Sequence, residues 1–302
     1  MLFNTSNINT TTLDDPLFLL KQVAIDVLRL DEIHPVVSGN KLFKLHYFLE
    51  AARSSAHKTI LTFGGAWSNH LPATAYACQS AGLKSIGIVR GEQPATVSFA
   101  LEQCIEYGMQ LKDVTRGAYA SKDDPGFTQM LRSEFGECLI VPEGGYDPLG
   151  AKGAALIMDL VKARYYTHIC TATGTATTLA GLLMAAKREQ EIIGVTVLKG
   201  MTDIEERVRN LSGGNANMDQ LTIFNGHHFG GYAKYTPELI QFMNQCWQRF
   251  QLPLDFVYTA KMLYAVLDGV KNNRFREGSR ILCLHTGGLT GNYSLTSGTL
   301  LY

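Results

Sequence analysis

Lys41 is the residue whose place in the sequence points most directly to chemistry. It follows a Ser-Gly-Asn turn at residues 38–40, just after a strand-like run at residues 23–30. Apolar residues then recur at helical spacing as far as Leu49, which predicts that Lys41 lies in the first turn of a helix. The unpaired N–H groups of that turn disfavour an ammonium ion. A neutral amine can attack an aldehyde and form a Schiff base, whereas the alternative is a solvated lysine at a helix start.

Three further segments combine glycines or hydroxyls with the end of an expected strand, where open α/β sheets bind ligands. In residues 64–70, Ser68 or Asn69 is a natural helix cap, and the free N–H groups there suit a substrate carboxylate. Residues 171–178 are rich in threonine and suit a phosphate dianion, although they match neither common nucleotide-binding motif. Residues 285–291 contain a Gly-Gly pair that lets a flat ring approach the backbone. Ordinary capped turns are the alternative interpretation of the first two segments, and a simple strand exit is the alternative for the third.

The composition is that of an ordinary globular protein. The 302 residues include 27 Lys plus Arg and 27 Asp plus Glu, so the formal net charge is zero and nothing favours a nucleic-acid partner. The six cysteines form no C-x-x-C pair, which favours buried free thiols in a reducing compartment. Neither a signal peptide nor an apolar run of membrane-spanning length is visible, so a cytoplasmic protein without membrane contact or metal site is expected.

Strand-like and helix-like runs alternate along most of the chain. Strands are predicted at 23–30, 59–63, 85–90, 110–115, 138–141, 168–172, 193–198, 221–224 and 280–285. Helices are predicted from 41, and at 69–81, 95–107, 126–135, 149–164, 178–189, 237–250 and 260–272. This alternation predicts mostly parallel sheets with helices on both faces, and residues 4–13 are expected to form a loosely anchored segment.

A lysine that forms a Schiff base, a phosphate cradle and a carboxylate-binding helix start together describe pyridoxal-phosphate chemistry on an amino acid. The chain resembles the fold-type-II pyridoxal-phosphate enzymes, specifically the 1-aminocyclopropane-1-carboxylate deaminase and D-cysteine desulfhydrase family. The resemblance rests on six motifs in order: Gly39-Asn40-Lys41-x-x-Lys44-Leu45, Gly64-Gly65-x-x-Ser68-Asn69-His70, Pro142-Glu143-Gly144-Gly145, Gly174-Thr175-x-x-Thr178-x-Ala180-Gly181, Val257-Tyr258-Thr259-x-Lys261 and His285-Thr286-Gly287-Gly288.

The resemblance implies a two-domain α/β fold like that of the tryptophan synthase β chain. Each domain would be an open, twisted, mostly parallel sheet flanked by helices. Residues 1–49 and 151–302 would form the large, cofactor-binding domain and residues 50–150 the small one. A homodimer is also expected from the family.

The resemblance also assigns cofactor-binding roles. Lys41 matches the lysine that forms the Schiff base with pyridoxal 5'-phosphate and moves the proton at Cα. Asn69 matches the residue that binds the pyridoxal hydroxyl. The phosphate cradle would consist of Lys44, Gly174, Thr175, Ala176, Thr177 and Thr178.

Substrate contacts follow in the same way. Ser68, with the neighbouring Asn69 and His70, matches the site of the substrate carboxylate. Tyr232 and Tyr258 match two tyrosines that line the substrate pocket, with a core or rim aromatic as the alternative for both. A small amino acid is therefore the expected substrate.

Thr259 and Thr286 favour one branch of this family over the other. Cyclopropane deaminases resemble one another in having Glu and Leu at these two positions, whereas D-cysteine desulfhydrases have Thr at both. A hydroxyl facing the ring nitrogen supports a protonated pyridinium only weakly, and thiol loss from Cβ needs less help than opening a carbon ring. These residues predict β-elimination from D-cysteine, or from a related β-substituted D-amino acid, to give pyruvate and ammonia. A 1-aminocyclopropane-1-carboxylate deaminase and a non-catalytic pyridoxal-phosphate-binding protein are the alternatives.

Overall fold

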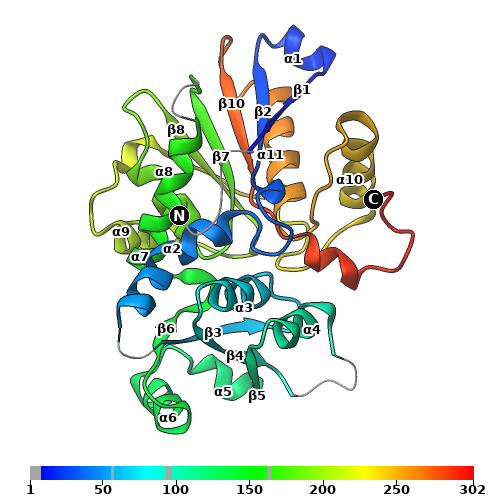
Figure 1. The fold of residues 1–302 in the computed structure, drawn as a ribbon. Helices are drawn as coiled ribbons and strands as arrows, with labels where there is room; N and C mark the ends of the chain where they lie inside the picture. Colours follow the sequence, from blue (N-terminus) through cyan, green and yellow to red (C-terminus); the bar gives the residue numbers. More distant parts are fainter. Residues whose placement is uncertain (1–7, 56–57, 93–96, 162–164) are drawn as a thin grey trace.

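Two sheets organise the chain, which the computed structural model describes for residues 8–55, 58–92, 97–161 and 165–302. The larger sheet has the order β1 (Thr10–Leu13), β2 (Ala24–Arg29), β10 (Arg280–His285), β7 (His168–Thr173), β8 (Glu191–Thr196) and β9 (Leu221–Phe224). The smaller sheet has the order β5 (Gln110–Val114), β4 (Lys84–Arg90), β3 (Thr59–Gly65) and β6 (Leu139–Val141). The larger sheet lies above the smaller one in Figure 1, with helix α2 (Asn40–Ser54) between them.

Strand direction and register follow the prediction of mostly parallel sheets. Every pairing between named strands is parallel except that of β1 with β2, in the part of the chain that the structure describes. Strand β10, the last in the chain, lies inside the larger sheet, where Cys283 is opposite Val27 of β2 and Cys170 of β7. Side chains alternate across β10, so that Leu282 and Leu284 enter one core and Ile281 and Cys283 enter the other.

Helices cover both faces of the larger sheet. Helix α2, together with α7 (Pro148–Ala155), α8 (Thr177–Met184) and α9 (Ile204–Ser212), packs on one face, and α10 (Pro237–Phe250) and α11 (Thr259–Lys271) pack on the other. The short helix α1 (Pro16–Leu20) connects β1 to β2. No helix of the described ranges is both long and apolar enough to cross a membrane.

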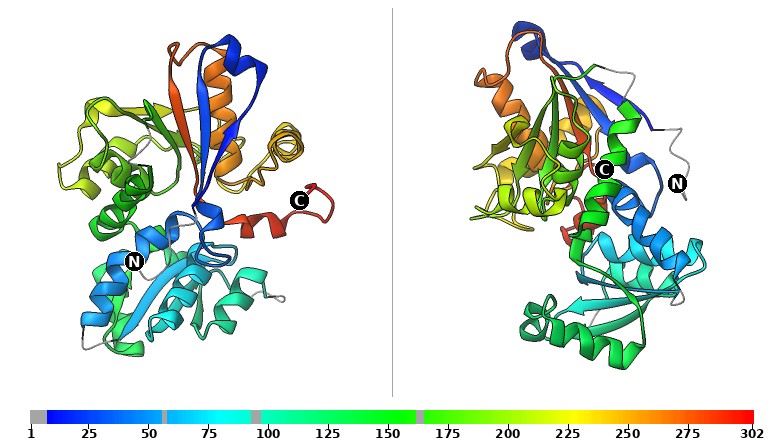
Figure 2. Two further views of the ribbon diagram at one scale, coloured as in Figure 1. Left: turned by 45° about the horizontal axis from the view of Figure 1, so that its top comes forward. Right: turned by 90° about the vertical axis from the view of Figure 1, so that its left-hand side faces the viewer.

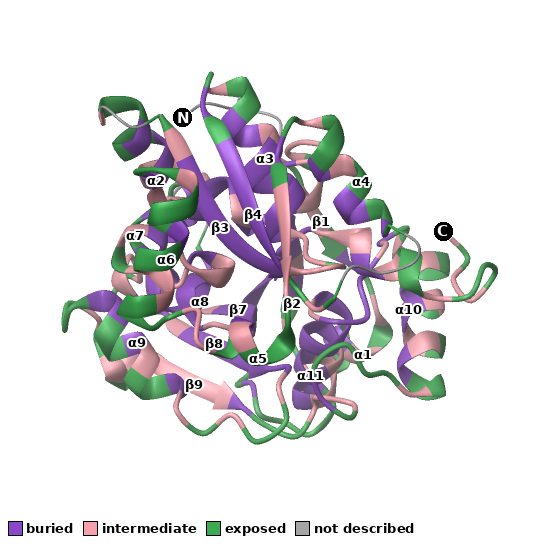
Figure 3. Cartoon of the chain, turned by 90° about the horizontal axis from the view of Figure 1, so that it is seen from below, coloured by how far each residue is buried: buried purple, intermediate pink, exposed green. Residues whose placement is uncertain are grey.

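The smaller sheet is also covered on both faces, as Figure 2 shows in two further views. Apolar side chains of α3 (His70–Ser80) and α4 (Phe99–Glu106) fill one face, and those of α5 (Arg116–Ala120) and α6 (Pro125–Phe135) fill the other. Strands β3 and β4 are therefore largely buried, as their purple colour in Figure 3 shows. One core contains Ile60 and Val141 of this sheet together with residues of the larger sheet, so the two layers are packed together. The domain limits at 49/50 and 150/151 stay a prediction.

Several elements differ from the expectations. Residues 10–13, expected to be loosely anchored, form the edge strand β1, because their backbone pairs with β2 although their side chains are mostly polar. The helix predicted at 149–164 ends at Ala155 and continues as a 3₁₀ turn (η3, Leu156–Val161), while residues 162–164 lie outside the described residues. Helix α8 ends at Met184 rather than 189, and the Gln190 side chain accepts the N–H of Lys187 to form a turn. Helices α1, α5 and α9 have no counterpart among the predicted helices.

The start of helix α2 is fixed by a close backbone crossing. Gly39 has a φ of +68°, and a Cβ atom there would lie 1.7 Å from the carbonyl oxygen of Thr286. The N–H of Asn40 donates to that same oxygen at 3.1 Å. Only glycine fits this contact, which brings the first turn of α2 to the carboxyl end of β10.

Because of this crossing, we expect that a single methyl group added at residue 39 destabilises the fold strongly. Gly39→Ala should lower the free energy of unfolding by more than about 3 kcal/mol, because the added Cβ meets the backbone of Thr286 in a strained conformation. Gly82 has the same φ of +68° with open space around it, so Gly82→Ala should cost only about 1–2 kcal/mol. Urea denaturation of both variants measures the difference, and equal losses would contradict the steric argument.

Candidate active site

Lys41 lies where predicted, in the first turn of α2, at the carboxyl end of the larger sheet. Its Nζ donates to Asn40 Oδ1 at 2.7 Å, and Asn40 Nδ2 donates in turn to Thr178 Oγ1 at 2.8 Å. Loss of water around the amine lowers the pKa of Lys41 to about 8, and the Asp255 carboxylate opposes that shift. Near neutral pH the uncharged fraction of this amine is therefore far larger than that of a lysine with the ordinary pKa of 10.5, and the uncharged form is the one that attacks an aldehyde.

The second lysine of the motif is held more tightly. Lys44 is buried, and its Nζ donates to the carbonyl oxygen of Gly144 at 3.1 Å. Burial holds the pKa of Lys44 well below 10.5, and the nearby Lys41 amine adds to this shift. A buried amine of this kind is costly unless an anion is bound beside it.

The threonine-rich turn connects β7 to α8 and has the features of an anion site. Ala176 precedes the helix in the left-handed conformation, with a φ of +66°, and no described side chain caps the helix start. The hydroxyls of Thr175 and Thr177 are hydrogen-bonded to each other at 2.9 Å. The N–H groups of the first helical turn are therefore left for an external acceptor such as phosphate. The link from Thr178 through Asn40 joins this turn to Lys41.

The turn before α3 contains the three residues that were predicted to contact the substrate carboxylate, and their side chains make different contacts. Ser68 Oγ accepts the N–H of His70 at 3.1 Å, so Ser68 rather than Asn69 caps the helix with its side chain. Asn69 Nδ2 donates to the carbonyl oxygen of Gly288 at 3.0 Å. The buried Asn69 Oδ1 has no hydrogen-bond partner among the described residues.

The His70 ring turns away from this site toward β3. Its Nε2 lies 2.9 Å from Thr62 Oγ1, whose own proton is donated to the carbonyl oxygen of Val141 at 2.8 Å. Nε2 must therefore carry the ring proton, which leaves Nδ1 as a bare acceptor. Burial, together with the charges of Lys41 and Lys44, lowers the pKa of His70 to about 3. Its side chain offers no donor to a carboxylate, so the predicted substrate contact of His70 is left to its backbone.

The two predicted pocket tyrosines lie side by side. The rings of Tyr232 and Tyr258 meet edge to face, with 6.2 Å between their centroids. A Cβ atom on Gly174 would lie 3.3 Å from the Tyr258 ring, so this ring borders the threonine-rich turn. Burial raises the pKa of Tyr258 well above its ordinary value, and the neighbouring Tyr232 adds to the rise. Both phenols therefore stay protonated at neutral pH.

Thr259 and Thr286 are both buried at the same end of the larger sheet. Thr259 begins α11, and Thr286 follows β10.

The structure adds two residues to which the sequence analysis assigned no role. Asn40 joins Lys41 to the threonine-rich turn, and the carboxylate of Asp255 binds the start of α11. Their places in the sequence could have indicated both residues, because Asn40 is next to Lys41 and Asp255 comes just before the Tyr258 motif.

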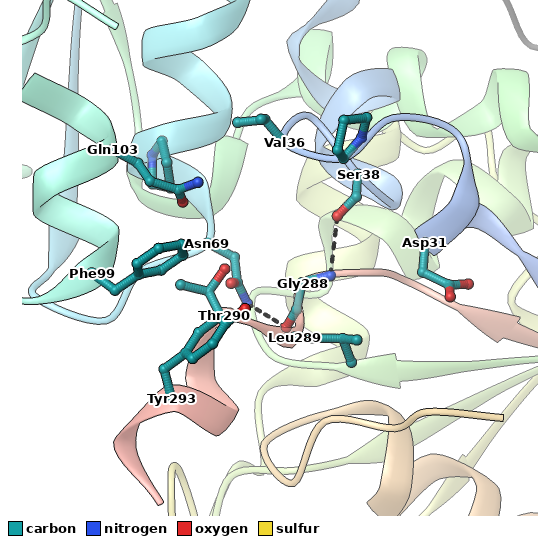
Figure 4. A pocket seen from close by; sticks show the side chains of 12 residues that line it. Asp31, Val36, Ser38, Asn69, Phe99, Gln103, Gly288, Leu289, Thr290 and Tyr293 are labelled. Atoms are coloured by element: carbon teal, nitrogen blue, oxygen red, sulfur yellow. Dashed lines mark hydrogen bonds between the residues drawn. The ribbon is translucent and has the colours of Figure 1, made fainter. Parts of the chain in front are cut away.

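A cavity of about 250 Å³ borders this site. Figure 4 shows the side chains that line it. Its lining comes from the loop at 35–38, from α3 and α4, and from the 3₁₀ turn η5 (Leu289–Ser294). Asn69 and Gly288 form part of its wall, and the Ser38 hydroxyl accepts the Gly288 N–H at 3.2 Å. The cavity is therefore continuous with the candidate site rather than separate from it.

Comparisons with known proteins identify the family and the fold. A sequence model of the pyridoxal-phosphate dependent enzyme family matches residues 9–287. A protein of Pyrococcus abyssi named "Putative 1-aminocyclopropane-1-carboxylate deaminase" is 28% identical over 289 residues, which cover 90% of this chain and 87% of the relative. A protein of the same name from Thermotoga maritima is 29% identical over 287 residues, with coverage of 89% and 90%. The crystal structure of an ACC deaminase homologue superposes with a TM-score of 0.82 at 23% identity, covering 97% of this chain and 92% of that one.

The fold is that of the fold-type-II enzymes, and the described residues fit pyridoxal phosphate. The uncapped start of α8 and the buried Lys44 amine suit its phosphate group. Asn69 Oδ1 and Thr173 Oγ1 are buried polar atoms without a partner in the described ranges, as expected where a polar ligand belongs. The Lys41 amine supplies the group that would bind the aldehyde.

The lowered pKa of Lys41 predicts how covalent capture of pyridoxal phosphate depends on pH. Only the neutral amine reacts, so the capture rate of cofactor-free protein should rise with pH through about 8 and then level off. A lysine with the ordinary pKa of 10.5 would keep gaining reactivity well above pH 9. Stopped-flow absorbance gives the rates, and a blocked lysine amino acid serves as the reference. A midpoint near 10 would show that the amine is solvated.

Proposed function

Because the chain belongs to the family of pyridoxal-phosphate-dependent enzymes, we propose that it releases ammonia from a small α-amino acid of the 1-aminocyclopropane-1-carboxylate type. The Lys41 amine carries this proposal, since it is largely desolvated and linked through Asn40 to Thr178. The names of the Pyrococcus and Thermotoga relatives support the cyclopropane substrate over D-cysteine, the substrate that Thr259 and Thr286 favour in the sequence. Hydrolysis of this substrate yields 2-oxobutyrate and ammonia.

Lys41 has two tasks in this proposal. It holds the cofactor, and after exchange with the substrate amine it moves a proton at a substrate carbon. The cyclopropane substrate has no hydrogen at Cα, so this carbon is a ring methylene beside Cα, whereas D-cysteine would lose its Cα proton. An amine with a pKa of about 8 is suited to both directions of proton transfer near neutral pH. The cofactor, when bound, supplies the electron sink, while the protein sets geometry and the choice of reaction.

The other side chains position the two reactants. Lys44 and the turn from Gly174 to Thr178 bind the phosphate, and Asn69 binds the pyridoxal hydroxyl. Ser68, with the backbone at the start of α3, binds the substrate carboxylate. The paired Tyr232 and Tyr258 form the wall of the substrate pocket.

D-cysteine remains a second candidate substrate because of the two threonines. Neither Thr259 nor Thr286 can supply a carboxylate directly to the ring nitrogen, and loss of a thiol makes the smaller demand on the electron sink. We also propose a homodimer in the reducing cytoplasm. All six cysteines are free and buried, which suits that compartment.

Borohydride reduction followed by peptide mapping identifies the lysine. Reduction of the loaded protein should fix the cofactor to Lys41 and to no other lysine. Lys41→Ala should bind pyridoxal phosphate without becoming labelled and should lose at least about 10³-fold in activity. Labelling of Lys44 or of the buried Lys261 would contradict the assignment.

Product analysis decides the substrate. Purified protein should release ammonia and 2-oxobutyrate from 1-aminocyclopropane-1-carboxylate with a higher kcat/KM than it releases pyruvate and sulfide from D-cysteine. The reverse order would reassign the substrate to D-cysteine. Ammonia from neither compound, in protein that binds the cofactor at Lys41, would exclude both.

A further inference from the structure

A buried carboxylate holds the start of helix α11. Asp255 is 1% exposed, and its Oδ2 accepts the N–H groups of Val257 at 2.9 Å and Tyr258 at 2.8 Å. Its Oδ1 accepts both the N–H of Thr259 at 2.9 Å and the hydroxyl of Thr259 at 2.7 Å. Four donors thus converge on one carboxylate, which explains how it tolerates burial.

This arrangement fixes the direction of the Thr259 hydroxyl. Its single proton points at Asp255 Oδ1, and one of its two lone pairs accepts the N–H of Asp255 at 2.8 Å. A hydroxyl has one donor and two acceptor sites, so one lone pair remains. Thr259 can therefore accept one further hydrogen bond but cannot donate one.

Thr286 differs in this respect. Its hydroxyl has no hydrogen-bond partner among the residues that the structure describes, and only its carbonyl oxygen is engaged, by Asn40. The Thr286 hydroxyl is free to turn as donor or acceptor. The two threonines that looked equivalent in the sequence thus offer different chemistry.

We propose that Asp255 is a positioning residue that acts through Thr259 to keep the ring nitrogen of the cofactor protonated. This inference rests on the proposed function and on the resemblance, which implies that the Thr259 hydroxyl faces the ring nitrogen of the cofactor. A neutral ring nitrogen has only a lone pair, which would face the lone pair of Thr259. A protonated ring nitrogen would donate to it, and the Asp255 carboxylate, hydrogen-bonded to the same hydroxyl, would stabilise the positive charge.

The charges around Asp255 are consistent with this role. The amines of Lys41, on α2, and Lys261, on α11, both experience the field of Asp255. Lys261 is fully buried and donates to the carbonyl oxygen of Gly231 at 2.7 Å, so it does not neutralise Asp255 by direct contact. The phenols of Tyr258, Tyr232 and Tyr302, which also lie in this field, are uncharged donors at neutral pH.

One consequence concerns the substrate. In the cyclopropane deaminases that this chain resembles, a glutamate stands where Thr259 does. Asp255 supplies a negative charge, as that glutamate does, but acts through the Thr259 hydroxyl and is therefore one hydrogen bond further from the ring nitrogen. The electron sink needed to open a carbon ring is thereby available without a glutamate at position 259.

The ring nitrogen can be observed directly in the loaded enzyme. With ¹⁵N-labelled pyridoxal phosphate, the wild type and Thr259→Ser should show the NMR shift of a protonated ring nitrogen, and so should Thr286→Val. Thr259→Val and Asp255→Asn should show the shift of a neutral nitrogen. Asparagine would donate to the Thr259 hydroxyl and release its proton toward the ring. Thr259→Ser and Thr259→Val decide the question if Asp255→Asn does not fold.

A cofactor analogue with C–H in place of the ring nitrogen separates a structural role from this one. Asp255→Asn should weaken equilibrium binding of pyridoxal phosphate about ten- to a hundredfold while changing binding of the analogue much less. Equal weakening of both, or an unchanged ¹⁵N shift in Thr259→Val, would overturn the inference and leave the proposed function standing. Failure of the wild type to bind pyridoxal phosphate at Lys41 would overturn both.

Discussion

The backbone contact between Gly39 and Thr286 is the constraint on which the site depends. It brings the start of α2 against the end of β10, with no side chain between them. Lys41 is thereby fixed at the carboxyl ends of the parallel strands, where the threonine-rich turn and the start of α11 also meet. The helix then continues into the core that both sheets share. A residue larger than glycine at position 39 would displace the Lys41 amine and would also disturb the core that the two sheets share.

Buried charge is the second organising feature. Three amines, those of Lys41, Lys44 and Lys261, have pKa values lowered by burial, and Asp255 is the carboxylate that acts on two of them. Such groups cost stability when they are charged without a partner. A bound phosphate dianion beside Lys44 would offset part of that cost. Cofactor binding and stability are therefore coupled, as they are for any ligand that binds only the folded state.

The sequence was sufficient for whatever depends on local patterning. Strand β9, helix α10 and strand β10 have the predicted limits, and Lys41 lies in the expected helical turn, because hydrophobic periodicity and glycine positions encode them. The sequence was insufficient for features that depend on hydrogen-bond partners in the folded structure. The N–H of Asp255 and its carboxylate together determine that Thr259 accepts, and Thr62 determines which nitrogen of His70 carries the proton. Strand β1 was missed for a similar reason, since its backbone partner rather than its polar side chains makes it a strand.

The place of β10 inside the larger sheet has a consequence for how the protein is made. β2 and β7 are each paired with β10 rather than with each other, so a nascent chain still on the ribosome lacks the strand that joins them. All residues up to Thr286 must be synthesised before Gly39 can meet it. A site built on this contact cannot form before residues 280–286 are made, and fragments truncated before residue 280 would expose two unpaired strand edges to chaperones and proteases.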